Sequence, residues 1–109
     1  MSKDVLGEFE HQVMLAILRL GRESYSVPLV LELEETTERD VAPAAVYIAL
    51  RRMEAKGLLT SRMTRANADE GGRERRYFAL TREGMIRLRD SRRTFVRLWE
   101  GVAATLDQV

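Results

Sequence analysis

The 109-residue sequence contains no cysteine, two prolines, one tryptophan and a single histidine, His11. Without cysteine, neither disulfide bonds nor thiolate metal sites can form, and one histidine offers too few ligands for a metal site. No apolar run approaches the length that spans a membrane, and the first dozen residues carry no hydrophobic signal core. These absences predict a cytoplasmic protein with no metal, cofactor or membrane segment, in which His11 is solvated.

The sequence also has few groups suited to catalysis. Catalysis needs a nucleophile beside a base, paired carboxylates in a cleft, or a set of metal ligands. Carboxylates are adjacent at Glu34-Glu35 and at Asp69-Glu70, but neighbours on a helix or loop point apart and are more simply solvated surface. We therefore expect that the protein is not an enzyme.

Charge is distributed unevenly along a chain that is otherwise typical of one small folded domain. Hydrophobic residues make up 45%, and the net charge is only +1. Residues 1–50, however, carry 4 basic and 9 acidic groups, whereas residues 51–97 carry 14 basic and 6 acidic groups. Charge segregation of this kind favours an anionic partner on one side of the molecule.

The basic half begins within residues 42–59, which predict one helix with a clear start and end. Pro43 suits the first turn, and Gly57 suits the left-handed position that closes a helix. One face forms an apolar stripe: Val46, Ala49, Leu50 and Met53. The opposite face carries small, aliphatic, aromatic and arginine side chains: Ala44, Tyr47, Ile48, Arg51 and Ala55, with Arg52 at its flank. Such a face fits a DNA major groove, which has phosphates at its walls and thymine methyls on its floor.

Two further helices are predicted before this one. Residues 8–20 form a core helix through apolar side chains at helical spacing: Phe9, Val13, Ala16, Ile17 and Leu20. In the next helix, Ser26 is the predicted cap and Pro28 lies in the first turn, while Leu29, Val30 and Leu33 face inward. Two helices and a short connection leading to Pro43 predict a helix-turn-helix.

An alternating pattern follows Gly57 and predicts a β-hairpin. Residues 58–64 and 76–80 are the expected strands, and the polar segment between them is the tip. Arginines lie on or beside it: Arg62, Arg65, Arg73, Arg75 and Arg76. A helix-turn-helix followed by a basic hairpin predicts a winged helix, whose hairpin, or wing, reaches along the DNA backbone.

The last element is a predicted helix of about 25 residues, capped by Thr81 and ending near Leu106. Its apolar positions form a near-heptad stripe: Met85, Leu88, Phe95, Trp99, Val102 and Leu106. A domain this small cannot bury so much helix by itself, so we expect a two-fold homodimer. The predicted fold is therefore mainly α with a small β-hairpin. It comprises a winged helix-turn-helix domain over residues 1–80 and a dimerisation helix over residues 81–109.

Two motifs carry a resemblance to a known family. Tyr47-x-x-Leu50-x-x-Met53-Glu54-x-x-Gly57-Leu58 is followed by Arg75-Arg76-Tyr77-Phe78-x-Leu80-Thr81-x-x-Gly84. Both motifs, in this order and at this separation, resemble the PadR family of bacterial transcriptional regulators. The single C-terminal helix is similar to the smaller branch of that family.

This sequence departs from the family pattern at two places. The family's second helix usually opens with a His-Gly-Tyr-like turn, and the corresponding place here reads Tyr25-Ser26-Val27. The family's wing commonly carries Gly-Arg-Pro-Arg, where this sequence has Gly72-Arg73-Glu74-Arg75. Glu74 removes the stiffness of proline and adds a charge that repels phosphate. Binding of the wing to DNA phosphates is therefore expected to depend on the arginines on either side.

The resemblance implies a DNA-binding repressor that a small aromatic or hydrophobic effector releases from its operator. The residues expected to contact double-stranded DNA are Tyr25, Ser26, Ala44, Tyr47, Ile48, Arg51, Arg52, Arg73, Arg75 and Arg76. Those expected at the dimer or effector site are Phe95, Trp99, Val102 and Leu106. Two other functions stay open: a small-molecule-binding protein with an aromatic pocket at the dimer centre, and a winged helix used for protein–protein contact.

Overall fold

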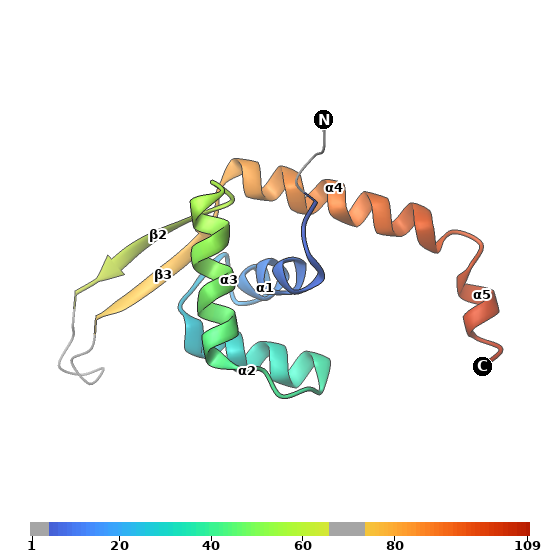
Figure 1. Cartoon of the computed structure of the whole chain (residues 1–109), viewed down its shortest axis with the longest axis horizontal. Coiled ribbons are helices and arrows are strands. Elements are labelled where there is room, and N and C mark those ends of the chain that lie inside the picture. Colours follow the sequence, from blue (N-terminus) through green and yellow to red (C-terminus); the bar gives the residue numbers. More distant parts are fainter. Residues whose placement is uncertain (1–4, 66–73) are drawn as a thin grey trace.

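The computed structural model describes residues 5–65 and 74–109. Three helices form a body from which a β-hairpin projects on one side and a long helix on the other (Figure 1). The elements follow in the order α1 (Glu8–Arg19), β1 (Glu23–Ser24), α2 (Ser26–Thr37), α3 (Pro43–Ala55), β2 (Leu59–Thr64), β3 (Arg75–Leu80), α4 (Arg82–Trp99) and α5 (Ala103–Leu106). This arrangement is the predicted winged helix.

The described strands form one antiparallel sheet in the order β1-β3-β2. In the central strand, Phe78 is paired with Ser61 of β2 and with Ser24 of β1. The hairpin strands agree with the prediction to within one residue at their ends. The two-residue strand β1 was not predicted, and it fastens the connection between α1 and α2 to the base of the wing.

The hydrophobic core lies where α1, α2 and α3 meet the inner face of the sheet. The predicted apolar stripe of α3 is fully confirmed, because Val46, Ala49, Leu50 and Met53 are all buried. Phe78 packs into the same cluster from β3. Burying one face of α3 in this way fixes which of its side chains remain on the surface.

Two details of the predictions for the first two helices were wrong. Leu20 was expected in the core, but it follows the last turn of α1 and is exposed. Ser26 was expected to cap α2, but it is the first helical residue, and Tyr25 occupies the cap position with extended backbone. In α1, the buried set also includes Met14, which takes a core position beside Val13.

The start of α4 is joined closely to the end of α3. Thr81 is the N-cap of α4 as predicted, since its hydroxyl accepts a hydrogen bond from the Gly84 N–H at 3.0 Å. The same hydroxyl donates to the carbonyl oxygen of Gly57 at 2.7 Å, and the Thr81 N–H donates to the Leu58 carbonyl at 3.1 Å. Gly84 lies against that Leu58 carbonyl, and a Cβ there would overlap the oxygen.

The predicted continuous helix to Leu106 is interrupted. α4 ends at Trp99, Gly101 has a φ of +76°, and only the single turn α5 follows. A left-handed backbone at Gly101 cannot continue a right-handed helix, so the chain turns there. Within the described ranges, no helix is both long and apolar enough to cross a membrane.

Candidate nucleic-acid interface

The exposed face of α3 presents the side chains that the sequence assigned to DNA. Tyr47 is 43% exposed and Ile48 is 56% exposed, although both are large hydrophobic side chains. Ala44, Arg51 and Arg52 are also exposed. The helix face is thus arranged as predicted: an apolar centre at Ala44 and Ile48 with arginines beside it.

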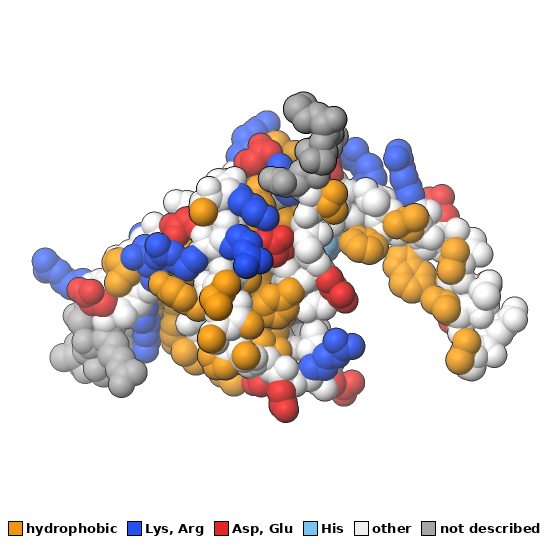
Figure 2. Space-filling view, in the orientation of Figure 1, with side chains coloured by type: hydrophobic (Ala, Val, Ile, Leu, Met, Phe, Trp, Pro, Cys, Tyr) orange, Lys and Arg blue, Asp and Glu red, His pale blue; other side chains and the backbone are white. Residues whose placement is uncertain are grey.

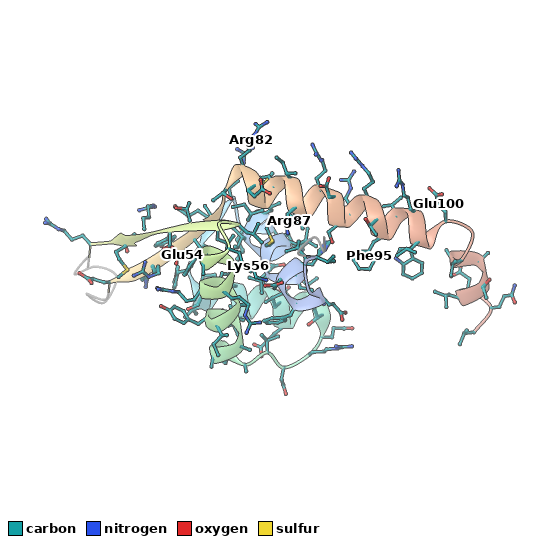
Figure 3. The ribbon with its side chains drawn as sticks, turned by 45° about the horizontal axis from the view of Figure 1, so that its top comes forward. Glu54, Lys56, Arg82, Arg87, Phe95 and Glu100 are labelled. Atoms are coloured by element: carbon teal, nitrogen blue, oxygen red, sulfur yellow. The ribbon has the colours of Figure 1, made fainter. Side chains whose placement is uncertain are left out.

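One flank of α3 is connected to the wing. The Tyr47 ring meets the buried ring of Phe78 edge to face, at a centroid distance of 6.4 Å. Further along the helix, Glu54 lies between α3 and the hairpin strands (Figure 3) and accepts a hydrogen bond from the Ser61 hydroxyl. The guanidinium of Arg76 donates to the same hydroxyl at 3.0 Å. Helix α3 and the wing strands therefore form one connected surface.

The outer face of the sheet carries a stack of charged and aromatic side chains. Arg62 donates two hydrogen bonds to Glu23, at 2.8 and 2.6 Å, and its guanidinium lies 5.2 Å from the centre of the Tyr77 ring. Tyr77 packs against Tyr25 at 5.3 Å, and Arg75 lies 4.5 Å above Tyr25. Cation–π contacts of this kind hold arginines in defined positions along the wing strands.

The ion pair on this face affects the titration of both partners. The hydrogen bonds that Arg62 donates lower the pKa of the Glu23 carboxyl, and the same bonds raise the pKa of Arg62. Both groups therefore stay charged across the neutral range. Arg62 is paired with a carboxylate, and Arg75 lies over the Tyr25 ring, just before the start of α2.

The two remaining DNA candidates differ in what the structure says of them. Ser26 is half-buried in the first turn of α2, next to Tyr25. Arg73 lies outside the described residues. On the face drawn in Figure 2, Lys and Arg side chains lie over α3, the wing strands and the upper side of α4, while several Asp and Glu side chains lie at the lower edge near α2.

A second surface runs along the underside of α4 and α5, where hydrophobic side chains are exposed to solvent (Figure 2). The four residues assigned to the dimer or effector site are between 43% and 52% exposed: Phe95, Trp99, Val102 and Leu106. An open groove of about 250 Å³ lies between α1 and this part of α4. Its lining residues are Glu8, His11, Gln12, Arg92, Phe95, Val96 and Trp99.

The prediction that His11 is solvated was wrong. Its Nδ1 atom lies 2.7 Å from the Ser91 hydroxyl, and its ring meets Phe95 edge to face at 5.8 Å. This partial burial lowers the pKa of the His11 imidazole. The prediction failed because a helical wheel of α1 cannot show that α4 returns across the side opposite the core.

Sequence reasoning missed two residues that organise the interface. Glu54 appeared only as part of a motif, and Glu23 was treated as one of many acidic groups. Glu54 could have been found from its place in the turn after Arg51, on the side of α3 that leads into β2. Glu23 gave no such signal, because β1 is too short for an alternating pattern to be seen.

Comparisons with known proteins support this architecture. Residues 14–90 match the model of the transcriptional regulator PadR-like family. Comparison of the sequence with curated proteins finds no match. A PadR family regulator from Eggerthella lenta is 27% identical over 89% of this chain and 82% of its own, with a TM-score of 0.68.

Two other solved structures have the same fold. A Streptococcus transcriptional regulator is 25% identical over 89% of this chain and 90% of its own, with a TM-score of 0.71. F93 from STIV, described as a winged-helix DNA-binding protein, is 13% identical over 84% of this chain and 91% of its own, with a TM-score of 0.67. The family match covers more than half of the sequence and agrees with the resemblance seen in its motifs. The chain belongs to the PadR-like family of transcriptional regulators.

Proposed function

We propose that the protein is a homodimeric repressor that binds an inverted-repeat DNA operator and is released from it by a small effector. Membership of a family of transcriptional regulators supports the general role and agrees with the expectation that the protein is not an enzyme. The observation that carries the proposal is the exposed face of α3, where Ile48 and Tyr47 stand beside Arg51 and Arg52.

An exposed isoleucine is poorly explained by the stability of the helix. β-Branching restricts its side chain in a helix, and the rest of the apolar stripe of α3 is already buried on the other side. Contact with a thymine methyl on the floor of the major groove accounts for the residue, because apolar groups discriminate thymine there. The arginines around it supply the phosphate contacts that position a protein on the duplex.

The dimer is supported by the apolar underside of the α4–α5 arm. Several large side chains are exposed in a row on a segment that packs against little of its own chain, and Trp99 is 52% exposed. A contiguous exposed apolar surface of this kind marks an interaction site. A second copy of the arm, placed by two-fold symmetry, would cover it and present the two α3 helices to successive turns of the duplex.

Selection of bound sites from random duplex DNA with the purified protein tests the proposal. The expected result is enrichment of an inverted repeat whose half-sites lie about 34 Å apart, one helical turn. If the protein binds no DNA even in low salt, the alternative function is favoured, in which the winged helix contacts another protein. Transcription from a promoter that overlaps the selected site should fall when the protein is added.

The groove beside Trp99 favours a second candidate function, the binding of a small aromatic or hydrophobic compound. Trp99, Phe95 and the His11 ring all line it, and Trp99 is the single tryptophan. Quenching of its fluorescence by planar aromatic compounds would report binding. Loss of DNA affinity in the presence of the same compound would identify it as an effector, whereas quenching without such a loss would favour binding as a separate function.

A further inference from the structure

Glu54 occupies an unusual position for a carboxylate beside a proposed DNA surface. Its side chain is 27% exposed, and one of its oxygens, Oε1, lies 3.6 Å from Nε of Arg51. The other oxygen, Oε2, accepts the hydrogen bond from Ser61. A carboxylate at this position repels DNA phosphate, so favourable contacts of Glu54 must offset this repulsion.

The hydroxyl of Ser61 connects this carboxylate to a second arginine. Ser61 donates a hydrogen bond to Glu54 and accepts one from Nη1 of Arg76 at 3.0 Å. The hydroxyl can do both, because it has one donor and two lone pairs. Glu54 thus has an arginine on each side: Arg51 from α3 and Arg76 from β3.

Because Ser61 holds Glu54 in place, the weak ion pair between Glu54 and Arg51 can position the arginine. An exposed pair between two free side chains contributes little, because both must be ordered to form it. Here the carboxylate is already fixed by β2, so only the Arg51 side chain has to be ordered. Its guanidinium is drawn toward the wing and away from the apolar centre of the helix face at Ile48.

We propose that Glu54 is a positioning residue that directs Arg51 and Arg76 together onto the DNA backbone, so that Arg51 contacts phosphate and not a base. The inference rests on the proposed function. Arg51 lies in the third turn of α3, whereas the residues that reach base edges come from the N-terminal part of a recognition helix. Base reading is then left to Ala44, Tyr47 and Ile48.

The alternative role for Arg51 is a pair of hydrogen bonds to a guanine edge. That contact uses two of the five guanidinium N–H groups and requires them to point to the groove floor beside Ile48, whereas Arg51 lies against Glu54, on the side of α3 that faces β2. A phosphate contact uses only part of the guanidinium and is compatible with the ion pair. The two roles differ in what a substitution does to sequence preference.

Salt-dependent binding of the full chain to a selected site and to random duplex separates these roles. Arg51→Ala and Arg76→Ala should each weaken both affinities by the same factor, on the order of a hundredfold, because the dimer loses one charge-assisted hydrogen bond at each of its two sites. The slope of log affinity against log salt should become shallower by about 0.9 for each phosphate that the variant no longer neutralises. Arg19→Ala, which removes an arginine paired with Glu32 on the far side of α1, is the control and should leave the slope unchanged.

Glu54→Gln tests the positioning role. Its amide still accepts from Ser61 but no longer attracts Arg51, so Arg51→Ala should cost less affinity in the Glu54→Gln background than in the parent. Equal reductions in both backgrounds would overturn the positioning role. A reduction on Arg51→Ala that is confined to the selected site would overturn the phosphate assignment while leaving the proposed function intact. If the parent itself binds no duplex DNA, the proposed function fails and this inference fails with it.

Discussion

The Nδ1 atom of His11 and the hydroxyl of Ser91 lie 2.7 Å apart and join α1 to α4 across 80 positions of sequence. Phe95 covers the same imidazole ring with its edge. Two other charged groups, Glu8 and Arg92, line the groove beside it. This contact connects the middle of the long C-terminal helix to the body of the domain, so its strength affects how firmly α4 is held.

The protonation of His11 should make the stability of the fold depend on pH. Burial lowers the pKa of His11 in the folded protein, whereas the unfolded chain protonates near pH 6.5, about the usual value. The unfolded state therefore binds more protons as the pH falls through and below that value, and stability decreases. The melting temperature should drop on acidification toward pH 5, and less so in His11→Gln.

The same experiment separates His11 from the acidic ion pairs. Arg62 and Arg19 lower the pKa values of Glu23 and Glu32, respectively. Their stabilising contributions are present above the pKa of an unfolded glutamate and disappear at more acidic pH. Measurements kept above about pH 5 therefore report mainly on His11. If the melting temperature changes with pH in the same way in the parent and in His11→Gln, the burial of His11 is not the cause of the pH dependence.

Gly84→Ala should destabilise the domain strongly. A Cβ at this position overlaps the carbonyl oxygen of Leu58, and backbone atoms cannot move aside as the end of a side chain can. Overpacking typically costs about 1–3 kcal/mol, and a backbone clash belongs at the upper end or beyond. Glu83→Ala, one residue earlier and exposed, should change the free energy of unfolding by less than about 0.5 kcal/mol. Urea denaturation of both variants checks the difference.

Trp99→Ala should weaken dimerisation more than it lowers the stability of a single chain. Half of this side chain is exposed within one chain, so the larger effect arises only where a partner covers it. Sedimentation equilibrium should show a higher dissociation constant, and melting should become more dependent on protein concentration. Arg97 lies on the opposite side of α4, so the control variant Arg97→Ala should leave association unchanged. A variant lacking Trp99 that remains dimeric at micromolar concentration would place the interface elsewhere.

Ile48→Ala should reduce sequence discrimination without unfolding the domain. Because Ile48 is 56% exposed, its removal creates no cavity, and alanine is the better helix former. Preference at one symmetric thymine should fall by about 1 kcal/mol or somewhat more per half-site. Replacing that thymine by uracil, which lacks only the methyl, should reproduce the effect in the parent and cost little in the variant. Equal uracil effects in both proteins would show that Ile48 does not read the methyl.

The central helix was predictable because its signals are local and agree with one another. Pro43 begins α3, Gly57 closes it with a φ of +78°, and the apolar spacing between them identified the buried face. Once that face was known, the exposed positions of Tyr47 and Ile48 followed from the helical period. The hairpin strands were equally predictable from their alternating pattern.

The parts that were not predicted depend on contacts between distant segments. The burial of His11 requires α4 to return across α1, and β1 exists only because β3 provides a partner for Glu23 and Ser24. The break at Gly101 is different, because the glycine was visible in the sequence. It was missed because the apolar spacing continues from Trp99 to Val102, which gave the impression of one uninterrupted helix.

The joint between Gly57 and Gly84 has a consequence for the operator. The Thr81 hydroxyl bridges the two ends of this joint, and the absence of a Cβ at Gly84 lets α4 begin directly against the carbonyl of Leu58. The direction of α4 relative to α3 is therefore fixed by backbone contacts. In a symmetric dimer paired through α4, that direction determines how far apart the two α3 helices stand. The length of the spacer between the proposed operator half-sites would then be set at this joint, by residues that are not among those assigned to DNA.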